Sequence, residues 1–289
     1  MSIDVWIFDV GRGSCAAIRS PNNYLTLIDC GNSDSFSPID WLAQKDWQTH
    51  NQYRLAKFIV THPHIDHISD IEKLTNSFLP AIIHRRTDLD SQRVSSAGTD
   101  TTSIYQRYEQ YFLPPQYTDD PPIIDWGENF YLKSYLLDES KVGEVSGTDS
   151  QYLNNSSLIT ILKYNGFNFA FSGDMETEGI ASLLRNSLAF NEDIVDGFHF
   201  YVTPHHGHPS GFSTEWFNLT GPSKIFNIAS ERSRKPGEDE AQTQIDIRYS
   251  DDKFSLGNNR ENRKMVSTRN DGHIYIQVSD DGTWSWATF

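Results

Sequence analysis

Residues 61–67 read Thr-His-Pro-His-Ile-Asp-His, so three imidazoles and one carboxylate fall within six residues. The apolar run Leu-Ala-Lys-Phe-Ile-Val-Thr at 55–61 leads into them and predicts a buried strand. The first two histidines point the same way in an extended segment, whereas the aspartate and the last histidine turn toward a second point as a helix begins. Imidazole and carboxylate suit zinc, manganese or iron, and two ions about 3.5–4 Å apart need this supply of ligands. The alternative is a polar surface loop that contains three histidines by chance.

Three further features place similar side chains at the ends of predicted strands. Asp29, in Ile-Asp-Cys-Gly, is expected either to orient a metal-binding histidine or to be a turn aspartate. Asp174, in Phe-Ser-Gly-Asp, is expected either to bridge two metals or to cap a following helix. The segment Thr-Pro-His-His-Gly-His at 203–208 supplies further ligands or structural histidines. Because a sheet gathers strand ends at one edge, the combination favours a metal site.

The remaining pattern predicts two sheets with helices outside them in a single domain of 289 residues. Asn165-Gly166 between two apolar runs is a strong hairpin signal. Residues 86–125 are polar and aromatic and are interpreted as an insertion, one helix and a loop, over the core. We expect polar loops at 138–152 and 231–264. The predicted strands are 3–7, 16–19, 24–28, 55–61, 81–84, 129–137, 157–164, 167–172, 198–203, 225–229, 273–278 and 283–287, and the predicted helices are 37–49, 66–78 and 175–189.

Composition limits the function. The net charge of −15 at pH 7 argues against nucleic-acid binding by bulk charge, because non-specific affinity comes from basic residues that replace counterions. The apolar runs are too short for a transmembrane helix, and no signal-peptide pattern is present, so we expect a cytoplasmic protein without a membrane partner. Cys15 and Cys30, the two cysteines, are expected to be reduced core thiols.

The motifs resemble a known family. Their order is similar to that of the metallo-β-lactamase superfamily of metal-dependent hydrolases, through Asp-Cys-Gly at 29–31, His-x-His-x-Asp-His at 62–67, Gly-Asp at 173–174 and His-His-Gly at 205–207. Phe-Asp-Val-Gly-Arg-Gly-Ser at 8–14 also resembles a segment of the hydrolase domain in bacterial competence DNA-uptake channel proteins, the ComEC type. So do the segments around 154–158, 171–174 and 266–272, and the resemblance spans about residues 5–285.

The resemblance implies a four-layer αββα sandwich, an α/β fold of two mixed sheets with helices outside and metals at one edge. It implies two divalent ions, Zn²⁺ or Mn²⁺. His62 and His64 would hold the first ion and Asp66 and His67 the second, and Asp174 would bridge them. His206 is favoured over His205 to complete the second site, because ligands in this family often precede a glycine.

One departure concerns the first ion. Many family members carry another histidine before the bridging aspartate, whereas residues 85–173 contain none. Asn155 stands roughly at that position, so the first ion is expected to be held more weakly, or by Asn155 and water. His84 comes too early in the chain and is interpreted as structural.

The expected reaction is attack by a metal-activated water on phosphorus or carbonyl carbon. We take Asp66 and His205 as catalytic residues, with His205 facing the substrate and protonating the leaving oxygen. The first hypothesis is a phosphodiesterase or nuclease acting on a nucleotide or a single-stranded nucleic acid. The second is a carbon-centred hydrolase of a lactone, thioester or amide, with the aromatic residues 105–131 as an apolar lid. The third is a non-catalytic domain with a degraded site.

A basic cluster supports the first hypothesis. Residues 231–272 hold nine basic and nine acidic residues, and the rest of the chain carries the whole net charge. We expect Arg232, Arg234 and Arg269 to bind substrate phosphate, together with Lys235, Arg263 and Lys264. The alternative is a solvated loop of mixed charge. The sequence leaves the oligomeric state open.

Overall fold

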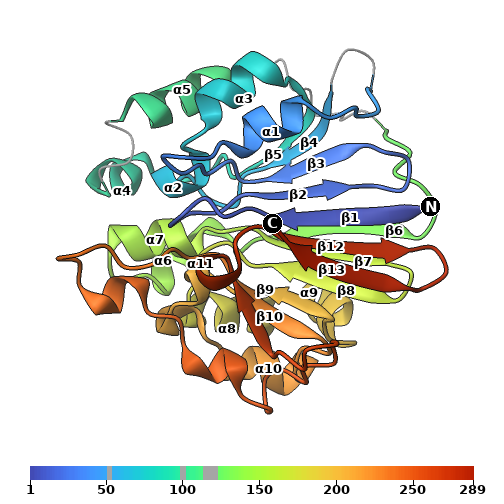
Figure 1. The fold of residues 1–289 in the computed structure, drawn as a ribbon. Helices are drawn as coiled ribbons and strands as arrows, with labels where there is room; N and C mark the ends of the chain where they lie inside the picture. The colour runs from blue at the N-terminus through green and yellow to red at the C-terminus, as the bar shows by residue number, and fades with distance from the viewer. Residues whose placement is uncertain (51–53, 98–101, 113–122) are drawn as a thin grey trace.

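Two mixed sheets lie face to face in the computed structural model, which describes residues 1–50, 54–97, 102–112 and 123–289 (Figure 1). The seven-stranded sheet has the order β13-β12-β1-β2-β3-β4-β5, and the six-stranded sheet has the order β11-β10-β9-β8-β7-β6. The strands are β1 Ser2–Ile7, β2 Ala16–Arg19, β3 Leu25–Ile28, β4 Leu55–Ile59, β5 Pro80–His84, β6 Phe130–Tyr135, β7 Ile159–Tyr164, β8 Phe167–Phe171, β9 Phe200–Val202, β10 Phe226–Ala229, β11 Met265–Ser267, β12 Ile274–Ser279 and β13 Trp284–Thr288.

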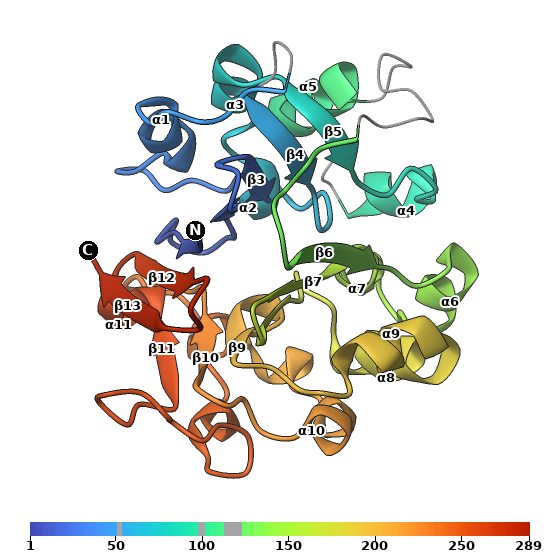
Figure 2. The same ribbon diagram turned by 90° about the vertical axis from the view of Figure 1, so that its right-hand side faces the viewer.

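Helices cover the outer faces of both sheets, which confirms the predicted αββα sandwich (Figure 2). The helices are α1 Pro38–Ala43, α2 Ile65–Ile68, α3 Ile71–Ser77, α4 Ser91–Ser96, α5 Ser103–Phe112, α6 Glu139–Glu144, α7 Asp149–Asn155, α8 Thr177–Asn186, α9 Leu188–Ile194, α10 Thr214–Thr220 and α11 Thr268–Asp271. Short 3₁₀ turns occupy His205–Gly207, Pro209–Gly211, Glu240–Thr243 and Ile247–Ser250.

The core between the sheets follows from strand periodicity. In β12 buried and half-buried residues alternate, and the buried Ile274, Ile276 and Val278 face the other sheet's Phe200, Phe226 and neighbours. The predicted hairpin is confirmed, since β7 and β8 pair antiparallel around Asn165 at φ 45° and Gly166 at φ 81°. These left-handed values suit a two-residue turn of the Asn-Gly type.

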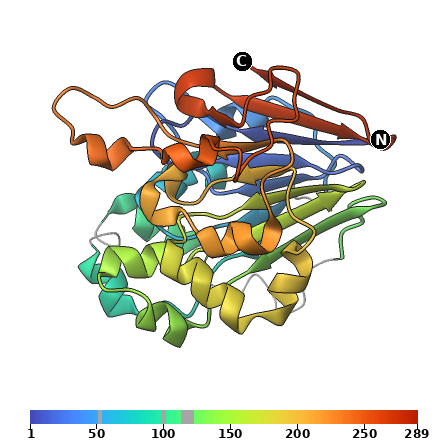
Figure 3. The same cartoon turned by 90° about the horizontal axis from the view of Figure 1, so that it is seen from below.

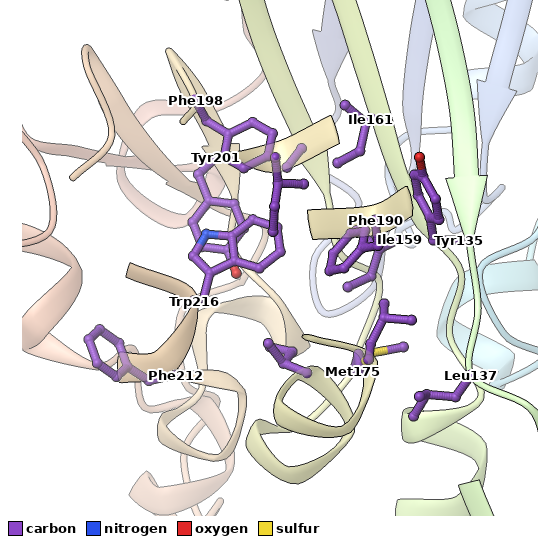
Figure 4. Close-up of a cluster of buried hydrophobic side chains, with 14 of the residues drawn as sticks. Tyr135, Leu137, Ile159, Ile161, Met175, Phe190, Phe198, Tyr201, Phe212 and Trp216 are labelled. Atoms are coloured by element: carbon purple, nitrogen blue, oxygen red, sulfur yellow. The ribbon is translucent and has the colours of Figure 1, made fainter. Parts of the chain in front are cut away.

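A second core packs the outer face of the six-stranded sheet against α7 to α10 (Figure 4). The indole of Trp216 stacks on Tyr201, with ring centroids 5.0 Å apart, and on Phe198, with centroids 5.2 Å apart. A third core packs α1, α3 and α5 against the seven-stranded sheet, and Cys15 and Cys30 lie buried in it as free thiols. The two cysteines therefore occupy the core positions predicted for them.

Some local predictions are wrong. The predicted helix 66–78 is two helices, α2 and α3, because the backbone at the break bonds elsewhere: Asp70 N–H donates to Cys30 O and Cys30 N–H donates to His67 O, both at 2.8 Å. The helix predicted at 37–49 ends at Ala43. The helix predicted at 175–189 ends at Asn186, and Leu188 begins the separate helix α9 with an exposed side chain. Residues 138–152 hold α6 and most of α7 instead of a loop.

The region 86–125 contains two described helices rather than one. Helix α5 packs against α2 and α3, and α4 packs against α7. Residues 98–101 and 113–122 of the predicted insertion lie outside the described residues. Part of the proposed aromatic lid therefore falls outside them too. No helix within the described ranges combines the length and apolarity needed to cross a membrane.

The parallel strands bring their carboxyl ends to one edge. β3, β4 and β5 run parallel to one another, as do β8, β9, β10 and β11. The segments that follow these strands gather at the left of Figure 1, around α2, α7 and α11, and on the same side of Figure 3. This is the edge at which ligands bind in open α/β sheets.

The Trp216 stack makes a stability prediction. Trp216→Ala removes a buried indole and leaves a cavity, so we expect the free energy of unfolding to fall by about 3–5 kcal/mol. Urea titration followed by circular dichroism measures this. Ile247→Ala, at a side chain 85% exposed, is the control and should change the value by less than about 0.5 kcal/mol. Equal effects of the two substitutions would contradict the assigned core.

Candidate metal centre

Two groups of metal-ligating side chains meet at the edge where the strands end. His62, His64 and Asp174 form one group, with one donor atom from each lying within 4.8 Å of the others. A second group of the same kind joins Asp66, His67 and His206. Each group therefore offers three donors of the type that zinc, manganese or iron binds.

Asp174 lies between the two groups. Its Oδ1 is 3.2 Å from His67 Nε2, while its Oδ2 is 3.4 Å from His206 Nε2 and 3.8 Å from His62 Nε2. The carboxylate is 5% exposed, so it is almost entirely removed from water. One carboxylate thus faces donors of both groups, which is the position required of a bridging ligand.

Hydrogen bonds at the far side of two imidazoles direct their free nitrogens into the centre. His67 Nδ1 donates to Asp29 Oδ2 at 2.7 Å, and His206 Nδ1 donates to the Ser230 carbonyl at 2.9 Å. Nε2 of both histidines is buried and forms no well-directed hydrogen bond among the described residues, although Asp174 oxygens lie 3.2 and 3.4 Å away. Buried polar atoms without partners are rare, and a cation at this point would satisfy both. The residues present therefore fit a metal site.

Asp29 is fixed tightly behind this site. It is fully buried with φ at 58°, and its carboxylate accepts bonds from Thr61 N–H, Thr61 Oγ1 and His67 Nδ1. A left-handed aspartate is uncommon, and the three bonds hold it there. It links the end of β3 to the histidine segment after β4, which is the orienting position anticipated for it.

Ser157 plays a similar part on the other sheet. Its hydroxyl lies 3.2 Å from His62 Nδ1 and accepts the Asp174 N–H at 3.0 Å. Gly173 makes this approach possible, since a Cβ there would lie 2.8 Å from Thr61 Cβ and 2.9 Å from Ser157 Cβ, and its φ is 52°. The close approach of Gly173 to Thr61 and Ser157 thus joins the two sheets next to the donor atoms.

The loop after β1 packs against the second group. Ser14 N–H donates to Asp66 O at 3.3 Å, and Ser230 Oγ donates to Gly13 O at 2.8 Å. A Cβ at Gly13 would collide with Asp66 O, so only glycine permits this contact. Arg12 directly precedes Gly13. It therefore lies on a segment that is hydrogen-bonded to Asp66 and to Ser230, whose carbonyl bonds to His206.

A family model agrees with this geometry: residues 8–217 match the model of the metallo-beta-lactamase superfamily. The chain belongs to the metallo-β-lactamase superfamily. Members of this superfamily are metal-dependent hydrolases, and the two donor groups fit a metal site in such a domain.

Solved structures with a similar fold are distant. They include YhfI from Bacillus subtilis, a metallo-beta-lactamase fold protein, at 12% identity over 91% of this chain and 95% of that one, with a TM-score of 0.45. Igni18, a metallo hydrolase from Ignicoccus hospitalis, has 11% identity over 99% of both chains and a TM-score of 0.47. Yeast PDE1 has 12% identity over 83% of this chain and 92% of that one, with a TM-score of 0.44. The search of curated protein sequences gave no match.

Charges within this metallo-β-lactamase site compensate one another. Burial lowers the pKa of His206 on its own, but the Asp174 and Asp66 carboxylates raise it to about 10. Burial likewise opposes a charge on His67, yet Asp174 and Asp29 raise its pKa well above the usual value. Burial and the charge of His67 lower the pKa of His62. Bound cations would compete with protons for the ring nitrogens of His67 and His206.

The structure separates His205 from His206. His206 joins the second donor group, whereas His205 does not. His205 Nδ1 lies 2.7 Å from Ser210 Oγ and 3.9 Å from Glu176 Oε1, and burial lowers its pKa to about 4. Both histidines have positive φ, 49° and 57°, so the backbone turns sharply and sends the two rings in different directions.

Asn155 does not join either donor group. Its Oδ1 accepts the Glu176 N–H at 3.0 Å and its Nδ2 donates to Ser146 Oγ at 3.1 Å. It therefore supports the loop after Asp174, and its part in holding the first ion stays a prediction. His84 lies on β5 outside both groups, and burial lowers its pKa to about 4.

The predicted substrate-binding arginines have partners of their own. Arg232 pairs with Glu238 at 2.6 Å, and Arg234 pairs with Glu240 at 3.5 Å. Arg269 donates to the carbonyls of Arg232 and Thr243. These contacts fold the 231–272 segment onto itself, and a role in phosphate binding stays a prediction.

Sequence reasoning missed Thr61, Ser157 and Ser230 as supports of the ligands. Ser157 lies in the Asn-Asn-Ser-Ser segment that carried part of the resemblance, so a signal for it existed. The sequence contained no signal for Ser230, because Ser230 contacts His206 through its backbone carbonyl, which any residue could supply. Such contacts become visible only when the strands are assembled.

Asp29→Asn should weaken metal binding. The amide NH₂ would face His67 Nδ1–H, which favours the other tautomer and places a proton on the Nε2 that faces the centre. We expect the dissociation constant for Zn²⁺ to rise about 10–100-fold, measured by competition with a chromophoric chelator. Asp34→Asn, at an exposed residue, is the control. Unchanged affinity in Asp29→Asn would show that this bond does not orient the ligand.

Ser157→Ala removes the hydroxyl shared by His62 and Asp174, with little change in volume. Because both ligands lose a fixed partner, we expect about tenfold weaker metal binding. Ser156→Ala is a matched control, since the hydroxyl of this buried neighbour donates to Leu153 O and contacts no metal ligand among the described residues. A larger loss of metal in Ser156→Ala than in Ser157→Ala would contradict the assignment.

Proposed function

We propose that this hydrolase is a phosphodiesterase that uses two divalent ions, Zn²⁺ or Mn²⁺, on a nucleotide or a single-stranded nucleic-acid end. The observation that carries the proposal is that two three-donor groups share a common neighbour in Asp174. His62 and His64 hold the first ion, Asp66, His67 and His206 the second, and Asp174 faces both. When bound, such a pair supplies a nucleophilic water near neutral pH and neutralises charge on the phosphoryl oxygens.

Two side chains of the centre are placed to act on substrate. The Asp66 carboxylate is 31% exposed, far more than that of Asp174, so Asp66 is the carboxylate that an incoming water and substrate meet. We assign it the hydrogen bond that orients the attacking water. The Ser210 hydroxyl fixes His205 at Nδ1, which leaves Nε2 to hydrogen-bond the leaving oxygen.

Arg12 supports an anionic substrate. It is exposed and forms no hydrogen bond or ion pair with any described residue, and its positive charge acts on His205. The loop that carries it is tied to Asp66 and Ser230, so its position beside the donors is constrained. A guanidinium matches the geometry of two phosphoryl oxygens. In a chain of net charge −15, an unpaired cation beside the metal ligands favours a phosphate-bearing substrate.

The resemblance of residues 8–14 to the competence-type hydrolase domain supports the same substrate class. The acidic net charge disfavours long duplex DNA and leaves a small nucleotide or a single-stranded end as the proposed substrate. The carbon-centred alternative depended on an aromatic lid. In the described parts of that region, α5 packs against α2 and α3, while Trp126 stacks on Phe130 and contacts Tyr24, so no observation favours the alternative over the phosphodiesterase.

The proposal predicts hydrolysis of bis-p-nitrophenyl phosphate in the presence of Mn²⁺ or Zn²⁺. Asp66→Ala removes a ligand and the hydrogen bond to water, so kcat should fall by about a hundredfold or more. Arg12→Gln should raise KM about tenfold with kcat nearly unchanged, because the guanidinium binds phosphate in the ground state as well. Arg185→Gln, at an exposed residue of α8, is the control.

Cleavage of a p-nitrophenyl ester without cleavage of the phosphodiester would replace the proposal with the carbon-centred alternative. Full metal loading with no activity on either compound would support a non-catalytic domain.

A further inference from the structure

A small cavity lies between the end of β5 and helices α4 and α5. Its volume is about 230 Å³, and it is built by part of the region that the sequence marked as an insertion. Its polar walls include Arg85, Arg86, Thr87, Ser91 and Glu109, and its apolar walls are Leu89, Val94 and the rings of Tyr105 and Tyr108. None of the metal-ligating residues lines it.

Arg86 is the unusual member of this wall. Its side chain is only 2% exposed, and Nε and Nη2 bond to the Asp88 carboxylate at 2.8 and 3.0 Å. Its third nitrogen, Nη1, is buried and lacks a hydrogen-bond partner among the described residues. A buried guanidinium nitrogen without an acceptor is costly, so its presence in a residue that lines the cavity indicates an absent acceptor.

The positions of the charged side chains around the cavity indicate that this acceptor is an anion. Arg85 is also buried, 6% exposed, and donates to Tyr108 Oη at 3.0 Å and Glu109 Oε1 at 3.3 Å. The carboxylates lie further out, with Asp88 53% and Glu109 26% exposed. Solvent screens these outer carboxylates more than the two buried cations. The inner end of the cavity is therefore suited to an oxyanion.

Elements that line the cavity pack against elements that lead to the metal centre. Val60 N–H donates to His84 O at 3.0 Å, so the chain at Arg85 runs alongside the segment that leads into His62. Helix α5 packs against α2, which carries Asp66 and His67. Helix α4 is joined to α7 by the Arg93–Asp149 pair at 2.8 Å, and α7 leads to Ser157. Two walls of the cavity thus contact elements that hold metal ligands.

We propose that this cavity binds an oxyanion at Arg86, and that the oxyanion is a second phosphate of the substrate cleaved at the metal centre. The oxyanion site stands on the cavity and on Arg86, whereas its assignment to a substrate phosphate rests on the proposed phosphodiesterase function. Arg86 binds through Nη1, while Asp88 holds the opposite edge of the guanidinium.

The first arm of the test uses inorganic phosphate and the metal-loaded full-length protein, followed by isothermal titration calorimetry. We expect one binding event from the metal centre and a second from the cavity. Arg86→Lys keeps the charge but loses the bidentate fork, so the second event should weaken at least about tenfold. Asp88→Asn removes a competing carboxylate and should tighten the same event about threefold or more.

Asp88→Asn keeps the test decisive if Arg86→Lys fails to fold, because Asp88 is half-exposed and Arg86 stays in place. A purely structural Arg86–Asp88 pair predicts no gain of phosphate binding in Asp88→Asn. Arg185→Gln is the control and should leave both events unchanged. Identical isotherms for the wild type and both cavity variants would overturn the proposal.

The second arm identifies the source of the oxyanion. Thymidine 5′-(p-nitrophenyl phosphate) is compared with the same compound carrying a 3′-phosphate. The additional phosphate should lower KM about tenfold in the wild type and give no advantage in Arg86→Lys, with kcat little affected. Suppose that the two compounds have equal KM values while calorimetry still shows phosphate binding in the cavity. The assignment to a substrate phosphate would then be overturned in favour of a free oxyanion. No cleavage of either compound, with that phosphate binding retained, would count against the phosphodiesterase and not against the oxyanion site.

Discussion

A carboxylate buried among imidazoles is the constraint on which this protein depends. Asp174 is withdrawn from water and faces nitrogens of His62, His67 and His206. A buried negative charge is tolerated only when paired and hydrogen-bonded. The surrounding contacts meet that requirement: Ser157 accepts the Asp174 N–H, and Asp29 fixes His67 from behind. Metal ions would reinforce the same arrangement, since they add positive charge where the acidic oxygens converge.

The centre also depends on the alignment of the two sheets. His62 to His67 follow β4 in the seven-stranded sheet, whereas Asp174 and His206 follow β8 and β9 in the six-stranded sheet. The apolar core between the sheets therefore sets the separation of the donors. Contacts at the edge refine it, as in the hydrogen bond from Leu158 N–H to Thr61 O at 3.0 Å, which joins the two sheets beside the ligands. Close packing explains why Gly173 admits no side chain at that junction.

Basic side chains are outnumbered by acidic ones in this chain, and most of its described arginines have partners. Most arginines of the 231–272 segment are bound to neighbouring carboxylates and carbonyls, which stabilises that segment. Outside that segment, Arg12 has no partner among the described residues, and Arg86 retains one unpaired buried nitrogen. In the chain order they flank the His62–His67 segment, one on the loop after β1 and one after β5. Together they suit a substrate that carries negative charge at more than one point.

The fold family, the ligand-bearing segments and the hairpin at Asn165-Gly166 could be predicted from the amino-acid sequence, because each depends on a short local pattern of residue type and spacing. The sequence also favoured a place for Asp29 and Asp174 beside the histidines, because both follow predicted strands. Other features depend on the assembled fold. The backbone turn at His205 and His206 directs the two rings apart, so that only His206 lies in a donor group. Backbone hydrogen bonds with Cys30 interrupt the helix at Ser69-Asp70, and Asn155 hydrogen-bonds to the loop after Asp174. The assembled fold also engages the predicted arginines and leaves Arg12 and Arg86 with free donors. These outcomes depend on hydrogen bonds and ion pairs between residues that packing brings together, and no local pattern encodes such partners.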